Sequence, residues 1–462
     1  MAERGRVRLV VLNYDGGHEV VRCFDHLMAL RWPPDELELV LIDNGSSDGS
    51  AHAVATRHPS VEVVQLDRNR GFPANNVALR DLAGVRYVGL VNNDAFVEPG
   101  FLAPLVEALE ADRSLGAACP LILFDHQYLE LAVEVPAERP GPGDPRELGV
   151  KLTGARVAGE DVWRRVHVPR GGHGLEVSGR SSWQWTGRRA VVRVPVRRGE
   201  PRPDRIELQA AALSPRVATF TSGRVRTEVE VHERPSWIEV AVDGEPFDVV
   251  NNAGSVVFDD GYGADRGFGE VDSGQFDEPA EVFAWCGGAV LLRPDYLADV
   301  GLFDEHLFLY YEDTDLSWRG QARGWRYRFV PEARVRHLHA ATSIDGSARF
   351  QYFTERNRLL VLAKNAPAPL LRRALGGFLG QTYDAARRDI VAALAQGRRP
   401  NPVPTYRRLR AGLGFLRSAP HALRARRRLR RRQTVSDAEL LMALVPTAGV
   451  SPSPRPAPAG EC

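Results

Sequence analysis

Strand and helix signals alternate through the first 125 residues, and no other feature of the sequence constrains the fold as strongly. A β-branched apolar run at residues 7–14 ends at the turn Asp15-Gly16-Gly17, and apolar residues at helical spacing follow as far as Leu30. Apolar runs at 37–43 and 85–91 repeat the pattern. Apolar strands that alternate with helices form a parallel sheet covered by helices on both faces. The sequence therefore predicts an α/β fold built on such a sheet.

Three carboxylates follow the predicted strands: Asp15, Asp43 and Asp94. Ligands of parallel sheets bind beyond the carboxyl ends of the strands, so these side chains are candidates for a binding site. Asp43 opens a Gly/Ser/Asp loop, where its carboxylate can accept hydrogen bonds from a ribose or a base and the loop amides can meet an anion. The same loop is equally typical of a plain turn.

Two further candidates concern a metal ion. Asp94, together with Asn92 and Asn93, offers the hard oxygen ligands that Mg²⁺ or Mn²⁺ prefers. The alternative is that Asp94 caps the segment that follows. His337 and His339 alternate, so on a strand they share one face and either can ligate a metal, although a single histidine is more often structural.

The segment Glu312, Asp313 and Asp315 places three carboxylates directly after two tyrosines. One of them can take a proton from an attacking hydroxyl, and a neighbouring carboxylate raises its proton affinity. The alternative is a helix start, with Asp313 or Thr314 as N-cap and Asp315 near the positive end of the helix dipole. The two interpretations are compatible, because a helix N-terminus is a rigid place to hold a base.

The middle and the end of the chain differ from its beginning. Residues 135–245 carry short alternating runs with Gly and Pro, which predicts an antiparallel β-sandwich or barrel inserted into the α/β domain, either as a stabilising insert or as a binding module. After residue 350 the chain is helical and rich in Arg, and its last residues are rich in Pro and Ala. We therefore predict five parts: 1–125, 126–248, 249–350, a helical 351–440 and a disordered tail at 441–462.

Composition excludes several classes of protein. The net charge of +1 argues against nucleic-acid binding driven by bulk charge. The four cysteines are widely spaced and lack zinc-binding spacing. No apolar run reaches about 18 residues, and the N-terminal run is too short for a signal peptide, so we expect no spanning helix and a location in the reducing cytoplasm.

The motifs, taken in order, resemble those of glycosyltransferase family 2, especially its rhamnosyltransferase-like bacterial branch. They read NYDGG, IDNGSSDGS, NRGF, NNDAFVEPGFL, CGGAVLLRPDYLADVGLFDEHLFLYYEDTDLSWR and VPEARVRH. The resemblance covers residues 1–125 and 250–365. It implies a GT-A fold, in which a Rossmann-like mixed sheet joins a nucleotide-sugar half to an acceptor half. It also implies an inverting transfer from a nucleotide sugar, aided by Mn²⁺ or Mg²⁺.

The resemblance also implies a role for individual residues. Asp313 corresponds to the catalytic base, with Glu312 beside it. Asp94 corresponds to the last acid of the family's DxD motif, whose first acid is replaced by Asn92 here, and His337 to the histidine that helps to hold metal and diphosphate. The implied donor-binding residues are Asn13, Asp15, Asp43, Asn69, Gly71, Asn93 and Asp94. The implied acceptor-binding residues are Trp285, Cys286, Gly287, Gly288 and Asp315.

Together these observations predict a metal-dependent glycosyltransferase that moves a sugar, with rhamnose favoured by resemblance, from a dTDP-, UDP- or GDP-sugar to a cell-envelope glycan or glycolipid. The alternative is a non-catalytic sugar-binding scaffold on a transferase-like core. A Rossmann dehydrogenase is excluded because no GxGxxG follows the first strand, and a nucleotidyltransferase would need a basic Gly-rich loop there. The Arg-rich helices after residue 370 predict either contact with the inner face of an anionic membrane or a packed subdomain with solvated Arg. Without interleaved aromatics they do not predict nucleic-acid binding.

Overall fold

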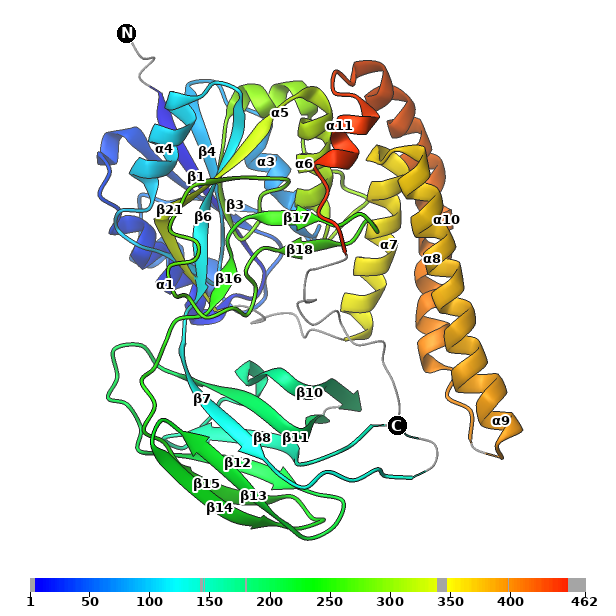
Figure 1. Ribbon diagram of the computed structural model, residues 1–462. Helices are drawn as coiled ribbons and strands as arrows, with labels where there is room; N and C mark the ends of the chain where they lie inside the picture. Colours follow the sequence, from blue (N-terminus) through cyan, green and yellow to red (C-terminus); the bar gives the residue numbers. More distant parts are fainter. Residues whose placement is uncertain are drawn as a thin grey trace. The chain divides into compact units, whose positions relative to one another are not determined.

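The computed structural model describes residues 5–141, 144, 146–178, 181–338, 347–397 and 399–447, and these form two compact units (Figure 1). The first unit contains the chain up to Leu123 and most of the chain from Val250 onward. Phe124–Val249 make up most of the second unit. The finer division into five parts stays a prediction.

Ten strands among the described residues form one mixed sheet in the first unit. They are β1 (Arg6–Asn13), β2 (Leu37–Asp43), β3 (Glu62–Gln65), β4 (Val85–Asn92), β5 (Ala95–Val97), β6 (Leu115–Phe124), β16 (Val250–Asn252), β19 (Ala280–Val282), β20 (Ala289–Leu292) and β21 (Arg326–His337). The order is β19-β21-β6-β20-β4-β1-β2-β3, with β16 beside β6 and β5 beside β21. Strands β4, β1, β2 and β3 are parallel, whereas β20 is antiparallel to β4 and β6. The predicted α/β fold with a Rossmann-like mixed sheet is confirmed.

Two apolar layers sandwich this sheet, because successive strand residues point to opposite faces. Leu9 and Val11 of β1 contribute to one layer and Val10 to the other. The first layer receives α1 (Gly17–Met28), α2 (Ser50–Arg57) and α4 (Leu102–Ala111). The second receives η2 (Phe72–Asn75), α3 (Asn76–Leu79), α5 (Pro294–Val300) and α6 (Glu312–Arg323). Burial on both faces explains why the strands read as continuous apolar runs.

The C-terminal part of the first unit is helical, as predicted. It consists of α7 (Ala348–Asn365), α8 (Ala368–Ala386), the π-helical η4 (Arg387–Ala392), α9 (Ala393–Ala395), α10 (Val403–Arg432) and α11 (Asp437–Met442). A capping box of Ser436 and Glu439 starts α11. Leu444 is buried, and the Val445 amide donates to the Val257 carbonyl at 2.9 Å. The prediction of disorder from 441 is therefore wrong for 441–447, while 448–462 lie outside the described residues.

The second unit contains a nine-stranded sheet in the part of the chain that the structure describes. Its strands are β7 (Gln127–Glu134), β8 (Lys151–Val157), β9 (Glu160–Asp161), β10 (His167–Ser178), β11 (Ser181–Val196), β12 (Arg205–Ala211), β13 (Arg216–Ser222), β14 (Val225–Val231) and β15 (Ser236–Ala241). All its pairings are antiparallel, in the main order β14-β13-β7-β11-β8-β12-β15. The sheet curls until its ends approach, since the Ala241 amide donates to Thr227 Oγ1 at 3.2 Å. The predicted β-rich insertion is confirmed as a curled antiparallel sheet.

A buried ionic network joins α6 to α7. Asp315 is fully buried, and its carboxylate accepts hydrogen bonds from Lys364 Nζ at 2.8 Å, Arg319 Nε at 3.1 Å and Asn365 Nδ2 at 2.8 Å. Lys364 Nζ also lies 2.6 Å from Asp304 Oδ2. The prediction that Asp315 contacts an acceptor is wrong, because both of its oxygens are engaged inside the protein.

Replacing the shared cation tests the importance of this network. Lys364→Met would leave Asp304 and Asp315 with less compensation for their charge, and breaking a buried pair in this way costs about 3 kcal/mol or more. We expect a loss of that size in the unfolding transition of the first unit, measured by urea denaturation. Lys151→Met, the same change at the chain's other lysine, lies in the second unit and should leave this transition within about 0.5 kcal/mol of the wild type. Equal losses in the two variants would contradict the assignment.

Candidate functional site

The carboxyl ends of the parallel strands meet in a polar network. Asn13, the last residue of β1, donates from Nδ2 to Ser50 Oγ at 2.8 Å and accepts at Oδ1 from Asn93 Nδ2 at 3.0 Å. The Asp15 carboxylate accepts from the Ser47 amide at 2.8 Å. Three of the predicted donor-binding residues thus lie at one edge of the sheet.

Asp43 and the residue after it fix the next part of this edge. Asp43 is 1% exposed and accepts at Oδ1 from the Ser46 amide at 3.3 Å. Asn44 Nδ2 donates to Asn69 Oδ1 at 3.1 Å and to the Gly71 carbonyl at 3.2 Å. The predicted residues Asn69 and Gly71 are therefore tied to the end of β2 by Asn44, a residue that sequence reasoning missed.

Asp94 and His337 lie together, as their shared predicted role requires. His337 Nε2 is 3.1 Å from Asp94 Oδ1, and His337 Nδ1 is 2.9 Å from Asn251 Oδ1. An amide oxygen only accepts, so Nδ1 carries a proton and donates to Asn251. Asn251 thus sets the imidazole tautomer, a supporting contact that sequence reasoning missed. His339, the other predicted histidine, lies outside the described residues.

Asp313 sits in the first turn of α6 and is partly exposed. Its Oδ2 accepts from the Gly287 amide at 3.1 Å, and its Oδ1 accepts from the Thr314 amide at 2.6 Å. Removal from water raises the pKa of Asp313, the two amide hydrogen bonds oppose this, and the negative charge of Asp265 adds to the increase. A carboxylate with a raised proton affinity, held by backbone amides, is suited to accept a proton.

Glu312, next to it, is in a different environment. It is buried, and within the described residues its Oε2 has no hydrogen-bond partner. Burial, followed by the charge of Asp313, raises the pKa of Glu312 well above its usual range. Burial without a counter-charge therefore favours the neutral form of Glu312.

The loop before α6 is strained. Phe308, Tyr310 and Tyr311 have φ values of +55°, +67° and +69°, which cost energy for bulky side chains. A single buried side chain offsets this cost: Asn357 Nδ2 of α7 lies 2.6, 2.8 and 2.8 Å from the carbonyls of Leu307, Leu309 and Tyr310. Asn357 therefore fixes the path of the chain into the residue predicted to be the base.

Gly71 connects this loop to the donor-side edge. Its φ is +70°, and a Cβ built on it would lie 2.0 Å from the Phe308 carbonyl oxygen. The next amide, of Phe72, donates to that same oxygen at 2.7 Å. The close approach requires glycine at this position.

The predicted acceptor-side residues separate into two groups. Trp285 is fully buried and packs edge-on against Phe303, so the prediction that it contacts an acceptor is wrong. Gly287 and Gly288 connect the site instead, since Gly287 donates to Asp313 and the Gly288 carbonyl accepts from the Asn92 amide at 2.9 Å. Cys286, between them and Trp285, is partly exposed, and burial of its thiol raises the pKa of that group.

Asp265 is a further acidic residue near the predicted base. It ends β18 (Gly263–Asp265), which pairs with β17 (Ser255–Val257). Its Oδ1 accepts from Asn252 Nδ2 at 2.6 Å and from Ser255 Oγ at 3.2 Å. The sequence signal that could have found it is an acidic residue within the Gly-rich segment before the CGG motif, although that segment contains other acidic residues as well.

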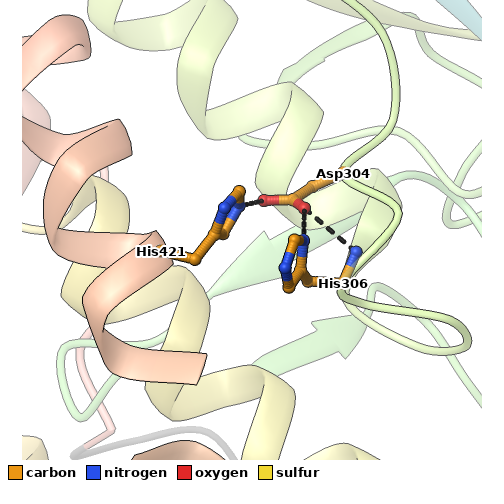
Figure 2. A group of neighbouring side chains, drawn as sticks. All are labelled: Asp304, His306 and His421. Atoms are coloured by element: carbon orange, nitrogen blue, oxygen red, sulfur yellow. Dashed lines mark hydrogen bonds and ion pairs between the residues drawn. The ribbon is translucent and has the colours of Figure 1, made fainter. Parts of the chain in front are cut away.

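A second group of possible metal ligands lies away from this edge. Asp304 accepts from His421 Nε2 at 2.9 Å and lies 3.3 Å from His306 Nδ1 (Figure 2). The two imidazoles stack with centroids 3.7 Å apart and planes inclined by 15°. Ring lone pairs lie in the ring planes, so nearly parallel rings do not direct them at one ion, and Lys364 already balances the Asp304 charge. We assign the group to anchoring α10 on this loop.

Part of the chain is similar to known proteins. Residues 9–130 match the family described as glycosyl transferase family 2. The matched segment is about a quarter of the chain. Over 65 residues, 14% of this chain, the sequence is 44% identical to N-acetylglucosaminyl-diphospho-decaprenol L-rhamnosyltransferase of Mycobacterium tuberculosis, strains CDC 1551 / Oshkosh and ATCC 25618 / H37Rv. The matched segment spans 21% of the length of these relatives.

Solved glycosyltransferases are distant neighbours of the chain. The mannosyltransferase PcManGT from Pyrobaculum calidifontis, in complex with GDP-Man and Mn²⁺, has a TM-score of 0.42 at 15% identity, covering 93% of this chain and 86% of its own. GalNAc-T7 with UDP, GalNAc and Mn²⁺ has a TM-score of 0.41 at 14% identity, covering 79% and 48%.

The contact at Gly71 gives a direct test of the loop geometry. Gly71→Ala places a methyl group against the Phe308 carbonyl, so we expect a loss of about 3 kcal/mol or more of unfolding free energy in urea. The matched control is Gly49→Ala, where φ is +77° but no atom lies within 4 Å. The control should cost only about 1–2 kcal/mol, the cost of a left-handed conformation alone. If the two variants lose the same stability, the contact with Phe308 is unimportant.

Proposed function

We propose that the protein is an inverting glycosyltransferase that moves a sugar from a nucleoside-diphosphate donor to an acceptor hydroxyl. The observation that carries the proposal is that the Asp94–His337 pair and Asp313 are both connected to the two glycines directly before β20. The Asp94–His337 pair adjoins Asn92, whose amide bonds the Gly288 carbonyl, and Asp313 bonds the Gly287 amide. A candidate diphosphate and metal site and a candidate base are therefore connected through adjacent residues.

A divalent cation fits the Asp94–His337 pair. Because His337 Nδ1 donates to Asn251, Nε2 and Asp94 Oδ1 are two acceptor atoms 3.1 Å apart, and such atoms need a proton or a cation between them. Asp94 and His337 would hold Mn²⁺ or Mg²⁺, which would neutralise charge developing on a departing diphosphate. The first acid of the usual motif is Asn92 here, so Asp94 alone supplies the carboxylate.

The chain's own residues account for the proton transfer. Asp313 takes the proton from the acceptor hydroxyl, while the Gly287 and Thr314 amides hold its two oxygens in place. The freed oxygen attacks the anomeric carbon from the side opposite the diphosphate, so a bond to the acceptor forms as the bond to the diphosphate breaks and the configuration inverts. On the donor side, Asp15 and Asp43 would hold the nucleoside, with Asn13, Asn69, Gly71 and Asn93 around it.

The sugar and the acceptor are proposed from the mycobacterial relatives. Their name assigns them transfer of L-rhamnose to N-acetylglucosaminyl-diphospho-decaprenol. We propose the same classes here: a deoxysugar donor such as dTDP-rhamnose, and a lipid-linked glycan acceptor of the cell envelope, approached from the cytoplasmic side of the membrane. No helix in the described part of the chain is both long enough and apolar enough to cross a membrane.

Removing the proposed base tests the reaction. Asp313→Asn keeps the shape of the side chain but cannot take a proton, so we expect transfer to fall by about 10²-fold or more. Nucleotide binding is measured by calorimetric titration with UDP, dTDP and GDP, each with and without Mn²⁺. The wild type should bind one of these nucleotides. Asp313→Asn should bind it as the wild type does, whereas Asp94→Ala should not bind it. The control Asp35→Asn removes an exposed carboxylate far along the chain and should change neither property. Near-normal transfer by Asp313→Asn would exclude it as the base, and no nucleotide binding by the wild type would favour the sugar-binding scaffold.

The pH dependence tests the coupling between Asp265 and Asp313. Transfer needs ionised Asp313, so activity should fall as the pH drops through its raised pKa, above the usual Asp value of about 3.9. Asp265→Asn removes a negative charge that raises this pKa, so the acidic limb of the pH–rate profile should move to lower pH. Asp272→Asn, further along the same segment, should leave the limb in place. If the acidic limb of Asp265→Asn moves to higher pH or stays in place, Asp265 does not raise the pKa of Asp313.

A further inference from the structure

Helices α8 and α10 form an antiparallel pair that runs side by side in Figure 1. Their contacts progress in opposite directions along the two helices: Gly412 approaches Phe378, and Arg408 Nε donates to Thr382 Oγ1 at 3.1 Å. The Asn401 amide donates to the Asp389 carbonyl at 2.8 Å at one end of the pair.

A normal surface helix buries its large apolar side chains, whereas α10 buries small residues and exposes large apolar ones. The helix buries Thr405, Ala411, Gly414 and Ala422, which are small. The exposed side carries large apolar side chains at alternating spacings of three and four residues, each between 48% and 64% exposed: Tyr406, Leu409, Leu413 and Leu416, with Leu423 one heptad beyond Leu416. Soluble proteins bury such residues and rarely leave a continuous apolar row in water.

The neighbouring helix extends this row. Leu379 and Tyr383 of α8 are 66% and 67% exposed. On α8, Leu379 and Tyr383 each follow a residue that contacts α10, so they lie about 100° further around the helix than the contact side. On α10 the row of large apolar residues is likewise rotated by about 100°, in the same sense, from the side that contacts α8. Because the helices are antiparallel, equal rotations in the same sense place both rows on the same side of the pair. We call this surface the apolar face.

Arginines surround the apolar face. Arg410, Arg417 and Arg424 are exposed along its edge on α10, and Arg427, Arg428 and Arg431 continue it toward the C-terminal end of the helix. Residues 403–432 contain no Asp or Glu. An apolar row edged by Arg without acidic residues is the pattern of helices that lie in the interface of an anionic bilayer.

We propose that the apolar face docks on an anionic lipid bilayer, with Leu and Tyr side chains entering the acyl boundary and the Arg side chains contacting lipid phosphates. A second copy of this chain fits the face less well, because the Arg-rich edge of α10, a helix without Asp or Glu, would meet the same edge of the other copy. Nucleic acid fits less well too, because the row is mainly aliphatic and offers few rings for stacking on bases.

The docked helices connect to the candidate site. Helix α7 packs against α10, where Arg356 donates to Ser418 Oγ at 3.1 Å, and the adjacent Asn357 holds the loop before Asp313. Docking would therefore hold the helices that support the predicted base on the lipid surface that carries a lipid-linked acceptor. This last step rests on the proposed function, whereas the docking itself does not.

Vesicle flotation of the full chain tests the proposal. We expect the wild type to float with vesicles of phosphatidylcholine and phosphatidylglycerol, to float less with phosphatidylcholine alone, and to be released in part by high salt. The double variant Leu413→Glu/Leu416→Glu should reduce the bound fraction at least ~10-fold. The reason is that two leucine side chains that would enter the bilayer are replaced by charged ones. The matched control is Val217→Glu, which adds the same charge at a 52% exposed valine of the second unit. It should float like the wild type.

Three results would overturn the proposal: no flotation of the wild type, equal flotation of the double variant, or a wild-type dimer in solution that the double variant makes monomeric. The last result would assign the face to a second copy of the chain. Calorimetry with nucleotides on the same samples separates the two proposals. Flotation without nucleotide binding by the wild type would leave the docking intact and remove the proposed transfer, and the reverse result would remove only the docking.

Discussion

The buried contact between Asp315 and Lys364 fixes the geometry on which the rest of the candidate site depends. It joins the first turn of α6 to the end of α7, and Arg319 and Asn365 complete the coordination of the carboxylate. A buried charge is tolerated only with such compensation, so the two helices cannot separate without a large cost in free energy. Helix α6 carries Asp313, and α7 carries Asn357. The ionic contact therefore holds the predicted base and the side chain that shapes its loop in one rigid frame.

Three carboxylates within four residues of α6 have three different states because their surroundings differ. Asp315 is ion-paired, Glu312 is buried without a counter-charge and so favours its neutral form, and Asp313 is partly exposed with two backbone amides on its oxygens. Like charges at this spacing would repel strongly if all were ionised and unpaired. The burial of Glu312 and the pairing of Asp315 leave Asp313 as the one member of this cluster that is both ionisable and accessible. The sequence placed the base in this cluster, and burial distinguishes its members.

How far the sequence predicted the structure depends on the range of the contacts involved. The sheet was predictable because strand and helix patterns are local, and the strand-end residues Asp15, Asp43 and Asp94 follow from it. Asp315 and Trp285 were misassigned because their burial is decided by Lys364 and Phe303, which are distant from them in the sequence. Asn357, Asn251 and Asp265 were missed for the same reason. An ordinary polar residue acquires a role only when a distant segment meets it, as Asn251 meets His337 across 86 positions.

The same limit explains why the helical periodicity of α10 was ambiguous. Apolar residues at spacings of three and four normally mark the face that a helix turns to the core. On α10 that face is solvent-exposed, and the helix packs through small residues that allow close approach to α7 and α8, as Gly412 does against Phe378 and Gly414 against Tyr352. Small residues on the packed side fix the helix close to its neighbours, and this close packing turns the Leu row outward. Periodicity alone does not show which side of α10 is packed and which is exposed. Because the small residues are packed and the large apolar ones are exposed, the Leu row is available to bind a bilayer.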